Sequence, residues 1–136
     1  MNPPEPRHHN HPAVVVISWV LGGGAAMGWL VLAFGALGCL MFSAMLFDAP
    51  GSEDNPYLWV VVYSLAALPV LCLFSAVTTP IGVALSQILR RRGRPKAGWA
   101  SLAAAALLAC LPLLGIGGVT AGFTLVNLLC DGSFSC

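Results

Sequence analysis

The sequence predicts an all-α, polytopic integral membrane protein with three transmembrane helices, its N-terminus in the cytoplasm and its C-terminus outside. Of its 136 residues, 58% are hydrophobic and only 8% are charged, whereas a soluble domain carries about 25% charged residues. A chain this short cannot hide so much apolar surface from water, so lipid must surround most of it. The second observation is that every charged residue falls outside three long apolar runs.

Each apolar run is long enough for one membrane crossing. The runs are Ala13 to Phe47, Tyr57 to Leu89 and Ala97 to Cys130. One spanning helix needs roughly 20 residues, and two with a turn need about 40, so three crossings are expected. The first run is longer than the h-region of a cleaved signal peptide, which predicts a retained signal anchor. The predicted plan is a disordered cytoplasmic arm (1–12), a membrane domain (13–130) with spans at about 19–47, 57–88 and 98–129, and an extracytoplasmic tail (131–136).

The orientation follows from the distribution of charge. Three crossings place all six Lys and Arg residues on one side, together with the N-terminus, and four of the five acidic residues on the other. Positive charge marks the cytoplasmic side. The high content of Ala, Gly and Pro with compact loops favours a bacterial inner (plasma) membrane.

The predicted cytoplasmic loop carries the densest charge in the chain. Its basic residues are Arg90, Arg91, Arg92, Arg94 and Lys96. They explain the topology, and they attract anionic lipid headgroups by about 1 kcal/mol each near a membrane surface. The loop is short and has no interleaved aromatic residues, so no nucleic-acid partner is expected.

Small residues at four-residue spacing predict where helix backbones approach closely. Gly24 and Gly28 form one such pair, and Gly118 and Gly122 form another. This spacing favours tight packing in lipid, either within the chain or between chains. The consecutive glycines at 22–24 leave open whether the first span is one long helix or is broken there.

Prolines and aromatic residues predict further features of the spans. Pro69, Pro80 and Pro112 are expected to bend their helices, and Ser75, Thr78 and Thr79 to bond nearby carbonyls before Pro80. Asn55 before Pro56 predicts an N-cap for the second span. Amphipathic rings favour the interfaces, which places Tyr57 and Trp59 at the outer one. Either Trp19 or Trp29 anchors the inner interface, and if Trp19 does, Trp29 lies deep and packs.

Five cysteines divide into two groups. Cys130 and Cys136 lie on the predicted outer side, where disulfides persist, and are predicted to form an intrachain bond. Cys39, Cys72 and Cys110 lie inside the spans as small apolar packing residues. A copper site made of these three thiolates is not favoured by their spacing, and the His8, His9 and His11 cluster is expected to be part of a solvated arm.

No catalytic, cofactor or metal site is predicted, because no ionisable Asp, Glu, Lys, Arg or His lies inside a span and no catalytic motif is present. The leading hypothesis is a non-catalytic protein that acts through helix–helix contacts, as an accessory subunit or an immunity-like neutraliser of a membrane-acting partner. The alternative is a homo-oligomeric channel or small transporter, with a pore lined by Ser75, Thr78, Thr79, Thr120, Thr124 and Asn127. A lipid or thiol enzyme is the least favoured class.

The topology makes the first testable prediction. Reporter domains fused after Lys96 and after Cys136 should lie in opposite compartments, the first in the cytoplasm and the second outside, because the charge asymmetry orients the spans. Activity of both reporters in the same compartment contradicts three crossings.

Overall fold

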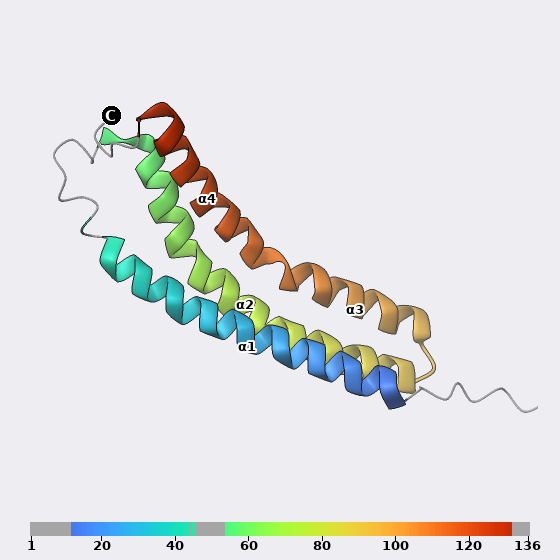
Figure 1. Cartoon of the computed structure of the whole chain (residues 1–136). Coiled ribbons are helices and arrows are strands. Elements are labelled where there is room, and N and C mark those ends of the chain that lie inside the picture. The colour runs from blue at the N-terminus through green and yellow to red at the C-terminus, as the bar shows by residue number, and fades with distance from the viewer. Residues whose placement is uncertain (1–11, 44, 46–53, 132–136) are drawn as a thin grey trace, which may run out of the picture.

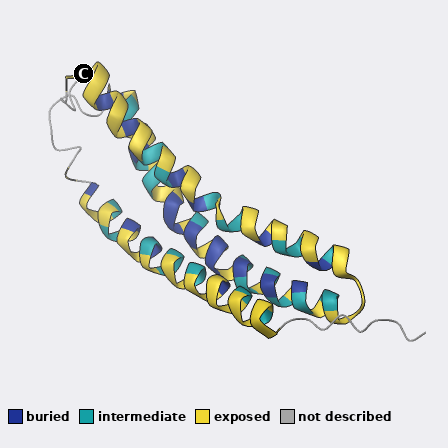
Figure 2. Ribbon diagram, turned by 45° about the vertical axis from the view of Figure 1, so that its right-hand side comes forward, coloured by how far each residue is buried: buried dark blue, intermediate teal, exposed yellow. Residues whose placement is uncertain are grey.

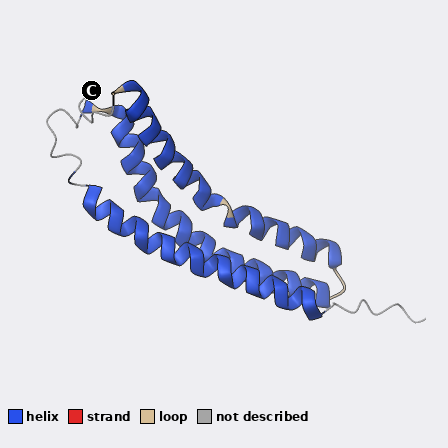
Figure 3. Cartoon of the chain, in the orientation of Figure 1, coloured by secondary structure: helices blue, strands red, loops and turns tan. Residues whose placement is uncertain are grey.

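The computed structural model describes residues 12–43, 45 and 54–131, and the regular structure over this part of the chain is helical. Figures 1 and 3 show how the helices are arranged. Three segments are long and apolar enough to cross a membrane, the last comprising two helices in succession. The predicted all-α fold, with three segments long and apolar enough to span a membrane, is therefore confirmed for these residues. The helices are α1 (Pro12–Ser43), α2 (Pro56–Arg91), α3 (Pro95–Ala109) and α4 (Leu111–Leu129).

Helix α2 is the central element. It packs extensively against each of the other three helices, and no comparably extensive contact joins α1 to α3 or α4 in the described part of the chain. Figure 2 shows buried residues concentrated along α2, while α1 and the α3–α4 segment are largely exposed on the sides away from it. The spans thus form a layer with α2 in the middle.

Helix α1 is a single helix of 32 residues that continues through Gly22–Gly24. It begins at Pro12, ahead of the span start predicted at residue 19. Gly22 faces α2, where a Cβ built on it would lie 3.1 Å from Cγ2 of Val83. At 1.5 Å per residue α1 is about 48 Å long, more than the roughly 30 Å of a hydrocarbon core. The helix must therefore tilt or extend beyond that core.

Local sequence signals fix both ends of α2. The Asn55 side chain accepts hydrogen bonds from the backbone N–H groups of Tyr57 (2.9 Å) and Leu58 (3.4 Å), which confirms the predicted N-cap. At the other end, Gly93 has φ = 75°. The N–H of Gly93 bonds the carbonyl of Arg90, and that of Arg94 bonds the carbonyl of Leu89. This is the Schellman pattern, which needs a left-handed residue where glycine is least strained.

The third span is interrupted at Cys110, two residues before Pro112. Figure 3 shows this break as a short loop between α3 and α4, as the predicted bend at Pro112 requires. A proline has no N–H, so the carbonyl four residues earlier, that of Leu108, lacks its usual helical donor. The Ser75 hydroxyl of α2 donates to that carbonyl at 2.7 Å. A backbone N–H at the end of α3 is also directed to this carbonyl, so the side chain from the central helix adds a second donor at the break.

Helix α2 remains continuous through Pro69 and Pro80, and Figure 1 shows it curving without a break. The predicted back-bonding before Pro80 is found for two residues. Thr78 donates to the Phe74 carbonyl at 2.9 Å, and Thr79 donates to the Ser75 carbonyl at 2.7 Å. Ser75 itself bonds across to α3 instead, as described above.

The bond from Ser75 to the proline break predicts a non-additive mutant pair. Ser75→Ala should lower the free energy of unfolding by about 0.5–1.5 kcal/mol, because the Leu108 carbonyl, in a low-dielectric surrounding, loses one of its two donors. In a Pro112→Ala background the same substitution should cost less, because residue 112 then supplies an N–H. Unfolding in mixed micelles measures both costs, and equal costs in the two backgrounds would show that Ser75 does not serve the break.

Candidate functional site: helix-contact surfaces and the basic end

Three glycines of α4 face α2 at close range. A Cβ built on Gly115 meets Leu68, one on Gly118 meets Ser64, and one on Gly122 lies 2.5 Å from Cγ2 of Val61. Because α2 and α4 are antiparallel, successive glycines of α4 meet successively earlier residues of α2. Gly118 and Gly122, singled out in the sequence, therefore contact α2 within the chain. Gly115 was missed, although it lies three residues before Gly118 and so on the same helix face.

Helix α3 contacts the other half of α2 in the same way. A Cβ on Gly98 would lie 2.6 Å from Cγ of Arg90 and 2.9 Å from the carbonyl oxygen of Ser86. Farther along, Gly82 of α2 lies directly against Ala105. Small residues, either on α2 or on the helix that it contacts, thus let α2 approach both α3 and α4.

Helix α1 differs, because a Cβ built on most of its glycines would contact nothing else in the described part of the chain. A Cβ built on Gly24, Gly28, Gly35 or Gly38 has no other heavy atom within 4 Å apart from its own helix. The close packing predicted at Gly24 and Gly28 is therefore not found among residues 12–43, 45 and 54–131. We call these four residues the glycine face.

The glycine face lies opposite the side of α1 that packs on α2. At about 100° per residue, the four glycines fall within about 80° of one another around the helix. The buried residues of α1, namely Gly22, Ala33, Ala36 and Ser43, cluster on the other side. Gly35 and Gly38 were not identified from the sequence. The signal for Gly35 is its spacing of seven residues, about two helical turns, from Gly28.

The tryptophans divide between surface and core. Trp29 is partly buried and packs against the cluster of Ala33, Ala36, Leu68 and Cys72. Trp19 is 45% exposed, and its indole Nε1 donates to Oε1 of Gln87 at 3.1 Å. The packing of Trp29 agrees with one part of the alternative in which Trp19 anchors the inner interface, and the anchoring by Trp19 stays a prediction. At the other end of α2, Trp59 and Tyr63 stack with ring centroids 5.5 Å apart.

The two ends of the helix layer differ in charge. The described basic residues surround the turn between α2 and α3, while the described acids, Asp54 and Asp131, lie at the opposite end, where Asn55 contacts Cys130. The guanidinium of Arg90 stacks on the ring of Trp99 at 4.1 Å. Arg90 is thus used in packing α3, whereas the other four basic side chains, those of Arg91, Arg92, Arg94 and Lys96, are exposed.

The cysteines lie in separate surroundings. Cys72 is buried in the core, while Cys39 and Cys110 are exposed, and these three are free thiols. Cys130 is buried beside Asn55, whose Nδ2 lies 3.9 Å from its sulfur. Its predicted disulfide partner, Cys136, lies outside the described residues, as do His8, His9 and His11. Among the described residues no group of three His, Cys, Asp or Glu side chains is placed to hold a metal ion.

The residues proposed to line a pore do not form one surface. Ser75 and Thr79 are buried, with their hydroxyls bonded inside the helix layer. Thr120, Thr124 and Asn127 are exposed on one face of α4, opposite its buried glycines. The hydroxyls of Thr120 and Thr124 bond carbonyls of their own helix.

No protein-family model, no curated protein and no solved structure matches this chain. The surfaces of the chain itself are therefore the guide to its function.

The close contact at Gly122 predicts a strong effect of one added methyl group. Gly122→Ala should destabilise the fold by about 1–3 kcal/mol, because the new Cβ meets Val61, including its backbone nitrogen at 3.2 Å. Gly117→Ala is the matched control, since a Cβ there meets nothing within 4 Å. Unfolding in mixed micelles compares them, and equal stability of the two variants would refute this α2–α4 contact.

Proposed function

We propose that this chain is a non-catalytic membrane protein that acts through helix–helix contacts with a different membrane protein. Its role is that of an accessory subunit or an immunity-like neutraliser of a membrane-acting partner. The observation that carries the proposal is the glycine face of α1, which no other described part of the chain packs against.

The physical argument concerns what glycine does for a membrane helix. Each glycine weakens a helix by about 1 kcal/mol relative to alanine in water. In the α2–α4 contact that weakening is offset, because the missing side chains let the two backbones approach. On the glycine face none of the described helices supplies such an offset, whereas the backbone of a partner helix would. No cofactor, metal or catalytic residue is needed for this role.

The proposal places the basic end of the helix layer in the cytoplasm, in a bacterial inner membrane. The separation of the described basic residues from Asp54 and Asp131 supports this orientation. It also places Cys130 on the oxidising side, which supports a disulfide to Cys136.

A homo-oligomeric channel is the second candidate. The observation in its favour is the row of Thr120, Thr124 and Asn127, whose polar side chains are exposed on α4. Such a face gains most when it meets another polar surface or water. A channel of this kind would use α4, whereas an accessory protein would use the opposite, α1 side of the layer.

Substitutions at adjacent glycines test the proposal. Gly28→Leu, on the glycine face, should weaken association by about 1–3 kcal/mol, because a large side chain separates the two backbones. Gly23→Leu is the control, since Gly23 is equally exposed but lies outside the face. The measurement is co-purification of the tagged chain from native membranes, with the amount of bound protein quantified against the wild type.

An unlike protein that is retained by Gly23→Leu and lost by Gly28→Leu supports the proposal. A homo-oligomer that survives Gly28→Leu but is disrupted by Thr124→Leu supports the channel. Equal binding of every partner by the two α1 variants rules out the glycine face as the contact.

A further inference from the structure

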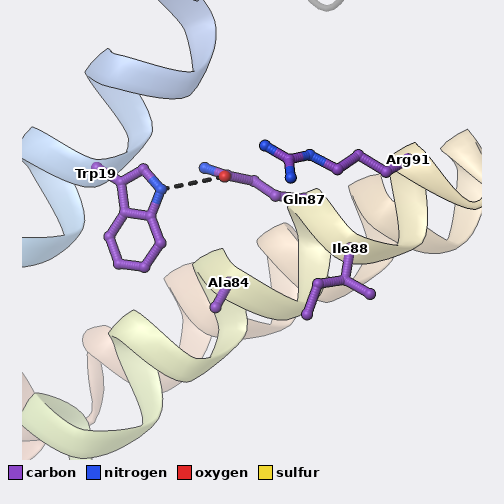
Figure 4. Close-up of a pocket in the computed structure, with 5 residues that line it drawn as sticks. All are labelled: Trp19, Ala84, Gln87, Ile88 and Arg91. Atoms are coloured by element: carbon purple, nitrogen blue, oxygen red, sulfur yellow. Dashed lines mark hydrogen bonds between the residues drawn. The ribbon is translucent and has the colours of Figure 1, made fainter.

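A hollow between α1 and α2 lies at the basic end of the helix layer. It has a volume of about 320 Å³ and is lined by Trp19, Ala84, Gln87, Ile88 and Arg91. Figure 4 shows Trp19 approaching from α1, with Gln87 and Arg91 on successive turns of α2. This volume is at the lower end of the roughly 300–1,000 Å³ typical of small-molecule sites.

One wall of the hollow is a fixed polar network. Gln87 accepts the bond from the Trp19 indole and donates from Nε2 to the Ser18 hydroxyl at 3.1 Å. Ser18 in turn donates to the Val15 carbonyl at 2.9 Å. The amide of Gln87 is therefore held in place by α1, and an amide nitrogen with two hydrogens has one N–H beyond the bond to Ser18.

Arg91 supplies the charge of the hollow. Its side chain extends over Gln87 in the direction of α1 (Figure 4). No acidic side chain of the described chain is near enough to neutralise it, because Asp54 and Asp131 lie at the far end of the layer. Arg90, by contrast, is engaged with Trp99. A guanidinium fork beside an amide N–H is suited to phosphate oxygens.

The remaining wall is apolar. Ile88 and Ala84 lie about one and two turns from Arg91, respectively, toward the middle of the membrane, and Ile88 is 48% exposed. A ligand that contacts both the polar and the apolar wall of the hollow therefore needs an anionic head and an apolar tail. Its depth is that of the membrane interface, because Trp19 and Trp99 lie at this end and tryptophan prefers this level.

We propose that this hollow is a discrete binding site for one anionic phospholipid, with its phosphate at Arg91 and Gln87 and an acyl chain along Ala84 and Ile88. This site differs from diffuse attraction of lipid to the whole basic loop. Diffuse attraction would depend equally on every basic residue of the loop, whereas the site depends on Arg91. It is also separate from the glycine face and does not depend on the proposed partner.

Two substitutions of equal charge test the site. Arg91→Gln should weaken binding of phosphatidylglycerol to the delipidated full chain by roughly fivefold or more, as judged by native mass spectrometry. Arg94→Gln is the matched control, since Arg94 is exposed in the same turn but does not line the hollow. It should change binding by less than about twofold.

Phosphatidylcholine and inorganic phosphate complete the experiment. Wild-type protein should prefer phosphatidylglycerol to phosphatidylcholine, and inorganic phosphate at millimolar concentration should not displace the bound lipid. Equal losses in the two arginine variants would overturn the discrete site in favour of diffuse attraction. Equal binding of the two lipids would also overturn it, and displacement by phosphate would reassign the hollow to a soluble anion.

Discussion

Close backbone contact along α2 is the constraint on which the rest of the structure depends. In lipid, apolar side chains gain little by moving from acyl chains to one another, so helices associate through packing and interhelical hydrogen bonds. This chain meets that requirement with a small residue on one of the two helices at each contact, either on α2 or on its neighbour. Gly22 accommodates Val83, Gly82 accommodates Ala105, and Gly122 accommodates Val61. The layer arrangement follows, because the central helix provides the complementary surface for both neighbours.

The polar backbone is satisfied by the same central helix. The break before Pro112 leaves the carbonyl of Leu108 without its helical donor, and the Ser75 hydroxyl supplies one. At the far end, Asn55 caps α2 and contacts Cys130, which links the start of α2 to the end of α4. At the basic end, Gln87 links α2 to two residues of α1. Polar side chains of α2, or of its cap, thus lie at three levels of the layer and connect it to its neighbours.

Composition and charge were enough to predict the fold class and the three spans, and the Asn-Pro pair at 55–56 was enough to predict the cap at Asn55. Apolar length, charge position and capping are all local properties of the sequence. The packing partners were not predictable in the same way. Gly24 and Gly118 have the same small-residue spacing, yet one is open and the other is tightly packed. The difference depends on which face of each helix turns to α2, which is decided over the whole length of the helix. Gln87 was missed for a related reason, since its importance comes from Ser18 and Trp19, nearly seventy residues away in the sequence.

The most direct test of this account is whether α1 turns Gly22, and not Gly24, toward α2. In a background without native cysteines, Gly22→Cys combined with Val83→Cys should form an intrachain disulfide under mild oxidation in membranes. A Cβ at position 22 lies 3.9 Å from that of Val83, within the roughly 3.5–4.5 Å that such a bond needs. Gly24→Cys with Val83→Cys should not form an intrachain bond. Efficient crosslinking of the Gly24 pair without the Gly22 pair would contradict the account, because the glycine face would then be turned to α2 and not available to a partner.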